Sequence, residues 1–164
     1  GFLAEDFVRD KDAVSACSLL AEICAWAKDQ GKTLFDVLMD IYVEYGFSLN
    51  HTVNVVKPGK TGADEIKQMM VNFRTNPPKE LGGHQVLAVR DYKEDTRKDL
   101  STGEVTKTGL PTSNVLYYEL SDNAWCCVRP SGTEPKIKYY FGVKGTSLTD
   151  ADAKLAALKE DLLK

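Results

Sequence analysis

The segment Arg129-Pro130-Ser131-Gly132-Thr133-Glu134-Pro135 combines residue types that bind phosphate groups. Gly132 would let the backbone approach an anion closely, and the amides and hydroxyls of Ser131 and Thr133 can donate hydrogen bonds to phosphate oxygens. Arg129 adds a planar guanidinium that can bind two oxygens at once. The segment is therefore a candidate phosphate-binding loop. A polar β-turn between strands is the other interpretation, because Ser, Gly and Thr are common in turns.

The charge around this segment is positive although the chain is acidic. Residues 129–144 hold four cationic side chains and one acid, a net charge of +3, whereas the 164-residue chain has −3, so the remainder carries −6. A local positive region of this kind suits a small anion. An acidic chain is a poor match to a nucleic-acid-binding or membrane-surface protein, because both partners are polyanions.

Strands are predicted on both sides of the loop. Val115–Leu120 and Ala124–Arg129 flank Ser121-Asp122-Asn123, the pattern of a hairpin with a three-residue turn. After the loop, apolar residues alternate with polar ones from Ile137 to Val143, which predicts a final strand with one apolar face. The hairpin therefore leads directly into the candidate loop.

The rest of residues 47–164 predicts further strands and helices around this hairpin. The expected elements are a strand over His51–Lys57, a helix capped by Thr61 and Asp64 with its stripe at Ile66, Met69, Met70 and Phe73, a strand over Gln85–Asp91, an exposed loop or short hairpin over 92–113, and a last helix capped by Thr149 and Asp152. This order predicts an α+β domain with a mainly antiparallel sheet.

Residues 1–46 predict two helices joined by a tight turn. Asp12 is the expected cap of the first helix, and Thr33 with Asp36 forms a capping box for the second. The first helix is apolar on most of its circumference, so we expect it to be buried against something larger. Two helices cannot supply that partner. We therefore expect residues 1–46 to form a separate, incomplete unit.

The composition is that of a soluble globular protein, with 43% hydrophobic and 27% charged residues. No apolar run approaches the roughly 20 residues that a membrane-spanning helix needs. The four cysteines lack the C-x-x-C spacing of zinc and redox sites. We expect them to be buried free thiols and the protein to be cytosolic.

The twelve residues from Arg129 to Tyr140 resemble the C-terminal signature of the α-D-phosphohexomutase family, which includes phosphoglucomutases and phosphomannomutases. Similarity extends to Arg9–Ala13 and Lys32–Leu34. The resemblance implies a C-terminal domain with a TATA-box-binding-protein-like fold over 47–164, preceded by the helical remnant of the third, α/β domain over 1–46. In this family the loop holds the phosphate that is not being transferred. That role is implied for Arg129, Ser131, Gly132 and Thr133, with Lys138 as a weaker electrostatic candidate.

Lys11 lies in a segment that resembles the family sequence whose lysine faces the active-site cleft. The resemblance implies substrate contact or proton transfer for Lys11, and this is the catalytic candidate in the chain. The other interpretation is a solvated lysine at a helix N-terminus.

The other motifs of the family are missing from these residues. They are a serine that is phosphorylated during turnover, an Asp-rich metal loop and a Gly-Glu-(Glu/Met)-Ser sugar loop. Gly1-Phe2-Leu3 looks like the residues that follow the sugar loop, so we expect the chain to begin inside the third domain. The resemblance implies Mg²⁺, with no metal ligands here, and a sugar bisphosphate activator in the intact enzyme.

Two function classes follow. The first is the phosphate-binding part of a mutase that interconverts sugar 1-phosphate and 6-phosphate and is inactive as a fragment, with the phosphosugar and the remaining domains as partners. The second is a stand-alone binding module for phosphosugars or nucleic acid. The acidic charge weighs against the second, as does the alternation that turns Tyr139 and Phe141 towards an apolar face. The sugar remains open among hexose, mannose, glucosamine and pentose phosphates.

Overall fold

The computed structural model describes residue 3 and residues 10–164. Gly1, Phe2 and Arg9, which contribute to the family resemblance, lie outside the described residues. The chain divides into two compact units, Gly1–Gly46 and Phe47–Lys164.

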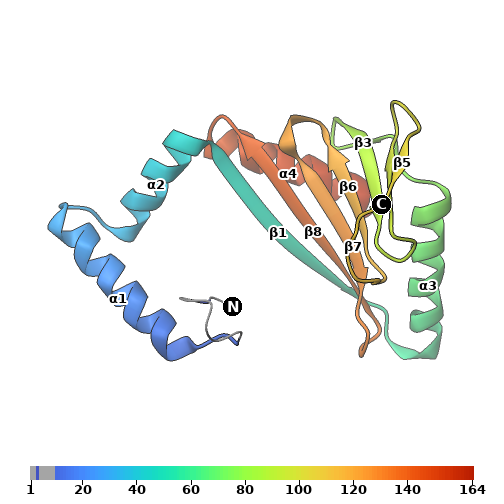
Figure 1. Ribbon diagram of the computed structural model, residues 1–164, viewed down its shortest axis with the longest axis horizontal. Helices are drawn as coiled ribbons and strands as arrows, with labels where there is room; N and C mark the ends of the chain where they lie inside the picture. The colour runs from blue at the N-terminus through green and yellow to red at the C-terminus, as the bar shows by residue number, and fades with distance from the viewer. Residues whose placement is uncertain (1–2, 4–9) are drawn as a thin grey trace. The chain divides into compact units, whose positions relative to one another are not determined.

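The second unit is built on one eight-stranded antiparallel sheet with the strand order β1-β8-β7-β6-β3-β4-β5, and β2 pairs with β3 (Figure 1). This confirms the predicted α+β class. Its strands are β1 (Phe47–Val56), β2 (Glu80–Leu81), β3 (His84–Asp91), β4 (Thr96–Asp99), β5 (Val105–Thr106), β6 (Leu116–Leu120), β7 (Trp125–Pro130) and β8 (Lys136–Gly145), and its helices are α3 (Gly59–Thr75), the 3-10 turn η1 (Ser121–Asn123) and α4 (Leu148–Leu162).

Helices α3 and α4 pack on one face of the sheet. Ile66 and Met70 of α3 and Leu158 of α4 are buried in one core with alternate residues of the strands, among them Cys126, Val128, Ile137, Tyr139 and Phe141. The residues between these on β7 and β8 point to the opposite face and stay at least partly exposed. We call this second surface the open face.

A row of side chains crosses the open face. The Trp125 and Tyr117 rings are stacked with centroids 5.4 Å apart, and the Arg90 guanidinium carbon lies 5.4 Å from the Tyr117 centroid. On the other side of Trp125, a Cβ added to Gly142 would lie 2.2 Å from its indole nitrogen. The backbone of β8 thus makes room for the indole ring only because residue 142 is glycine.

Replacing Gly142 with alanine is expected to lower the stability of the second unit by about 1–3 kcal/mol, because the new methyl group overpacks the Trp125 ring. Chemical denaturation measures this change. Gly132→Ala is the matched control, since a Cβ there meets nothing within 4 Å. Equal stabilities for the two variants would contradict the packing described for Trp125.

Glu119 joins two arginines on the open face. Its Oε1 accepts from Arg90 Nε at 2.5 Å and from Arg97 Nε at 2.9 Å, and its Oε2 accepts from Arg97 Nη2 at 2.7 Å. The hydrogen bond from Arg97, and then that from Arg90, lowers the pKa of Glu119 despite partial burial.

The contribution of Glu119 to stability should therefore be present at neutral pH and disappear in acid. A carboxylate whose folded-state pKa is depressed stabilises the fold above its unfolded pKa of about 4.3, and this contribution is lost as the pH falls through the lower folded value. Glu119→Gln should lower the melting temperature at pH 7, and the difference from wild type should shrink below pH ~4. A difference that stays constant from pH 7 to pH 3 would contradict this origin.

Several boundaries differ from those predicted. The predicted Thr61/Asp64 cap is wrong, because α3 begins at Gly59 after Pro58 without a side-chain cap. The predicted Thr149/Asp152 cap is also wrong, since Ser147 caps α4 by accepting from the Asp150 amide. Strand β1 begins at Phe47, earlier than predicted, and the short strand β2 was not predicted. For residues 92–113 the structure has the hairpin alternative, formed by β4 and β5.

The first unit consists of α1 (Ala13–Asp29) and α2 (Leu34–Tyr45). Both predicted caps are present: Asp12 accepts from the amides of Val14 and Ser15, and Thr33 and Asp36 form a capping box. None of the described helices is both long enough and apolar enough to cross a membrane.

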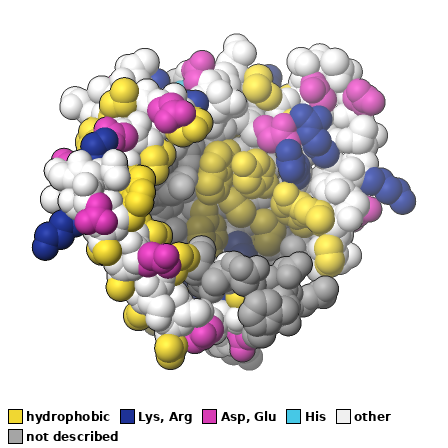
Figure 2. Space-filling model, turned by 60° about the vertical axis from the view of Figure 1, so that its left-hand side comes forward, with side chains coloured by type: hydrophobic (Ala, Val, Ile, Leu, Met, Phe, Trp, Pro, Cys, Tyr) yellow, Lys and Arg dark blue, Asp and Glu magenta, His cyan; other side chains and the backbone are white. Residues whose placement is uncertain are grey.

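Most apolar residues of the first helix are exposed within this unit. Ala27 is the buried residue of α1, whereas apolar side chains of both helices, such as Val14, Trp26 and Phe35, are more than half exposed. Figure 2 shows that hydrophobic side chains lie on the surface of the molecule. Cys17 and Cys24 are likewise exposed, and all four cysteines are free.

Candidate phosphate-binding site

Strands β7 and β8 bring the two principal cations together. Arg129 pairs with Lys138 across the two strands, and Pro130 pairs with Ile137 directly before the loop. Because Val128 and Tyr139 point into the core, Arg129 and Lys138 project from the open face at the base of the loop. Neither cation has a hydrogen bond or ion pair with any residue that the structure describes. Two adjacent cations without an acidic partner form a place for an external anion.

The Ser131 hydroxyl oxygen organises the loop. It accepts from the amides of Thr133 at 3.4 Å and Glu134 at 3.3 Å, while the Ser131 amide donates to the Lys136 carbonyl at 2.8 Å. A hydroxyl that accepts in this way still carries a hydrogen that it can donate to an anion. Ser131 can therefore hold the turn and contact a ligand at once, whereas the Thr133 amide is already used within the loop.

Two donors in the loop remain available among the described residues. The Gly132 amide and the Thr133 hydroxyl have no partner in this part of the chain. A Cβ added to Gly132 would meet nothing within 4 Å, so the space over its backbone is open. The loop can thus offer an amide and two hydroxyls beside the Arg129 guanidinium.

Glu134 lies in the loop but is compensated by a lysine. It forms an ion pair with Lys136, and the hydrogen bond and charge of Lys136 lower the pKa of Glu134, with Lys138 adding a smaller effect. In this ion pair one negative charge and one positive charge near the loop compensate each other. Arg129 and Lys138 then set the positive charge of the site.

The loop also borders a pocket of about 470 Å³ on the side of α3. Its lining includes Ser131, Gly132 and Thr133, the start of α3, and Asn114. The Lys57 amide donates to the Pro135 carbonyl at 2.8 Å and ties the loop to the segment before α3. Arg129 and Lys138 do not line this pocket, because they stand on the open face. The pocket and the two cations thus lie on different sides of the loop.

Lys11 belongs to the first unit, directly before α1. Its side chain is 67% exposed, and its ammonium lies 3.5 Å from Asp10 Oδ1. The structure thus places the catalytic candidate in one unit and the five loop candidates in the other. Sequence reasoning missed Asn114, because it lies outside the loop and precedes a strand that could be recognised only by its apolar residues.

The site offers binding groups and no activated nucleophile. Burial raises the pKa of the Cys127 thiol to about 11, although the nearby Arg129 charge acts in the opposite direction. A thiol with that pKa is protonated at neutral pH and reacts poorly. Within residues 10–164, no three His, Cys, Asp or Glu side chains are grouped so that they could hold a metal ion.

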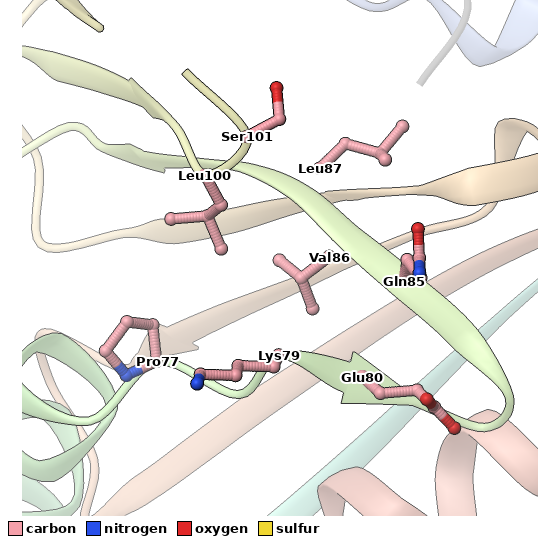
Figure 3. Close-up of a pocket in the computed structure, with 8 residues that line it drawn as sticks. All are labelled: Pro77, Lys79, Glu80, Gln85, Val86, Leu87, Leu100 and Ser101. Carbon is pink, nitrogen blue, oxygen red and sulfur yellow. The ribbon is translucent and has the colours of Figure 1, made fainter. Parts of the chain in front are cut away.

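A second pocket, of about 570 Å³, lies beside β2 and β3 (Figure 3). Its charged lining residues are Lys79 and Glu80, of opposite sign, and Pro77, Val86 and Leu100 make much of the rest apolar. Gln85 pairs with Glu80 at the beginning of β3, whereas the candidate loop follows the end of β7. The mixed charge makes this pocket a weaker place for a phosphate.

The chain is similar to known proteins in sequence and in fold. A family model described as "Phosphoglucomutase/phosphomannomutase, C-terminal domain" matches residues 70–161. Phosphoglucomutases from Staphylococcus aureus strains MSSA476 and MW2 are 38% identical over 158 residues, which cover 96% of this chain and 28% of those proteins. The chain thus spans less than a third of the length of these curated relatives.

A solved structure shares the fold. The open form of the exocytosis-sensitive phosphoprotein pp63/parafusin, a phosphoglucomutase from Paramecium, matches with a TM-score of 0.56 and 16% identity over 96% of this chain and 26% of that one. The signature from Arg129 to Tyr140, the antiparallel fold and the matching family model lead to one conclusion. The chain belongs to the phosphoglucomutase/phosphomannomutase family, whose C-terminal domain it carries.

Proposed function

We propose that this chain is the C-terminal, phosphate-binding part of a mutase that interconverts sugar 1-phosphate and sugar 6-phosphate through a phosphoserine enzyme and a bisphosphate intermediate. The observation that carries the proposal is the Arg129–Lys138 pair, which projects beside a loop with available donors and has no acidic partner among the described residues. In this role the loop holds the phosphate that does not react, and so fixes the sugar while chemistry proceeds at its other end.

Each loop residue has a distinct part in this proposal. Arg129 takes two phosphate oxygens through its guanidinium fork, and Lys138 adds charge from the neighbouring strand. Ser131 and Thr133 donate from their hydroxyls, and Gly132 donates its amide where no side chain obstructs the ligand. Because the bisphosphate must reorient between the two half-reactions, the same loop receives the 6-phosphate in one orientation and the 1-phosphate in the other.

Lys11 and the metal belong to the remainder of the proposal. We assign Lys11 to substrate contact or proton transfer, supported by its segment's resemblance to the family. Mg²⁺ would act at the phosphoserine, and no ligand for it is assigned to this chain. A cytosolic location is inferred from the four free thiols.

Titration of the chain with glucose 1-phosphate tests the binding role. In ¹H–¹⁵N spectra, the amides of residues 131–134 should shift with increasing ligand, and Arg129→Ala should abolish or strongly weaken the effect. Gly132→Ala should weaken binding without loss of stability, because only the ligand comes close to that position. Loop amides that do not respond, or that respond equally in Arg129→Ala, would defeat the proposal.

We also propose that the division at Gly46 separates two domains, with 1–46 the helical remnant of the third family domain. The apolar side chains exposed on α1 and α2 support this assignment, because they require a covering partner. Limited proteolysis should cut near Gly46 and leave a resistant fragment beginning close to Phe47. Resistance of the 40–50 region that equals that of the sheet would speak against two domains.

A further inference from the structure

The structure assigns a substrate-recognition role to Asn114, which we infer donates its side-chain amide to a hydroxyl of the sugar whose phosphate is held by the loop. This inference rests on the proposed function and extends it from the phosphate to the sugar. Asn114 is oriented by Arg74, which lies far from the loop in sequence.

Arg74, near the end of α3, is fixed by an acidic partner. Its Nε donates to Asp91 Oδ2 at 2.7 Å and its Nη2 donates to Asp91 Oδ1 at 3.3 Å. The two side chains are only 18% and 13% exposed. A two-point ion pair that is largely shielded from water holds a guanidinium in one orientation.

The same guanidinium orients Asn114. Arg74 Nη2 donates to Asn114 Oδ1 at 2.7 Å. A guanidinium has only donors, so the amide oxygen of Asn114 must face it, and the NH₂ group must point elsewhere. Among the residues that the structure describes, this NH₂ group has no acceptor. Asn114 therefore presents a donor in a fixed direction.

Asn114 also lines the pocket that the loop borders. Leu116 pairs with Val128, so the segment before β6 runs beside the end of β7, where the loop begins. Asn114 and residues 131–134 line one pocket without being part of one loop. A phosphosugar whose phosphate is held by the loop has this pocket beside it, and the chemistry of the Asn114 amide matches a hydroxyl oxygen of the sugar.

The pocket's own cations do not replace this donor. Lys67 lines the same pocket, but its ammonium is paired with Asp64 at 2.9 Å. The neutral amide of Asn114 suits a neutral hydroxyl, whereas the charged groups on the open face suit the phosphate. This division predicts that Asn114 affects phosphosugar binding and leaves the binding of inorganic phosphate unchanged.

The experiment compares Asn114→Ala, Asn114→Asp, Arg129→Ala and a control in the 164-residue chain. Asn114→Asp keeps an acceptor for Arg74 but lacks the NH₂ donor, and Asn114→Ala removes the donor without adding charge. Asn72→Asp is the matched control. The side-chain oxygen of Asn72 likewise accepts a hydrogen bond, from Gln68 Nε2 at 2.9 Å, and Asn72 lines a different pocket. Dissociation constants for glucose 1-phosphate and for inorganic phosphate are measured by chemical-shift titration.

Both Asn114 variants should bind glucose 1-phosphate about 3- to 10-fold more weakly than wild type, the range expected for one lost hydrogen bond. Asn114→Ala should bind inorganic phosphate as wild type does, and Asn72→Asp should change neither ligand. Arg129→Ala should weaken both ligands.

Wild-type affinity for glucose 1-phosphate in Asn114→Ala would overturn the inference about Asn114. If Arg129→Ala binds the same ligand more weakly than wild type, the proposed function still holds. A loss confined to Asn114→Asp would be a charge effect and would also overturn it. Equal losses for the two ligands in Asn114→Ala would contradict contact with the sugar. Unchanged binding in Arg129→Ala would instead defeat the proposed function.

Discussion

Replacing Arg129 with alanine is expected to lower kcat/KM for glucose 1-phosphate by about 10- to 150-fold in a full-length mutase that contains this chain. The lost charge-assisted hydrogen bonding is worth roughly 1.5–3 kcal/mol, and each tenfold change corresponds to about 1.4 kcal/mol. Steady-state kinetics in both directions should show similar losses, because the same loop serves both orientations of the bisphosphate.

The fold should tolerate this change. Arg129 is exposed and forms no hydrogen bond or ion pair with any described residue, so its removal breaks no such interaction with them. Arg129→Lys should restore only part of the activity, because an ammonium cannot reproduce the two-point contact of a guanidinium. If Arg129 served only to stabilise the β7–β8 hairpin, alanine would lower the melting temperature and leave kcat/KM unchanged.

The second large effect is the complete absence of mutase turnover from the 164-residue chain alone. The chain provides groups that bind a phosphate, but neither a phosphoserine motif nor an Asp-rich metal loop occurs in its sequence. An assay with glucose 1-phosphate, glucose 1,6-bisphosphate and Mg²⁺ should give the background rate.

Turnover above background that survives repurification would contradict this prediction. Two controls separate inactivity from misfolding. The chain should show a cooperative thermal transition, and it should bind glucose 1-phosphate in the titration described above while failing to convert it. The inactivity of an unfolded sample would not test the prediction, so both controls are run together with the assay.

Much of the sheet could be predicted because its residues alternate strictly. Ile137, Tyr139, Phe141 and Val143 are apolar at every second position, and all four are buried on the face that α3 and α4 cover. The capping box formed by Thr33 and Asp36 could also be predicted from the sequence, because both of its hydrogen bonds are local. Local periodicity and local capping therefore carried the correct parts of the prediction.

The failures concern choices between local alternatives and contacts between distant residues. Ser147 and Thr149 are both possible N-caps, and Ser147 caps because α4 begins at Leu148, two residues earlier than a Thr149 cap implies, with Ala151 packed against Gly145. The Arg74–Asn114 contact joins residues 40 positions apart, so no sequence pattern reveals it. The burial expected for the first helix depends on a covering partner that a pattern within residues 1–46 cannot supply.

The loop residues were identifiable from chemistry, but their arrangement was not. The sequence shows Ser, Gly and Thr shortly after an arginine. The pairing of Arg129 with Lys138, in contrast, depends on the register of β7 and β8. Likewise, only the structure shows that the Thr133 amide is used by Ser131 and that the Gly132 amide is available.

The most direct measurement is a crystal structure of the chain with glucose 1-phosphate bound. We expect the phosphate over the tip of the loop, with oxygens within about 3.2 Å of the Arg129 guanidinium, the Ser131 hydroxyl and the Gly132 amide. A phosphate bound elsewhere, for example beside Lys79, with the loop and Arg129 free of ligand, would contradict this expectation.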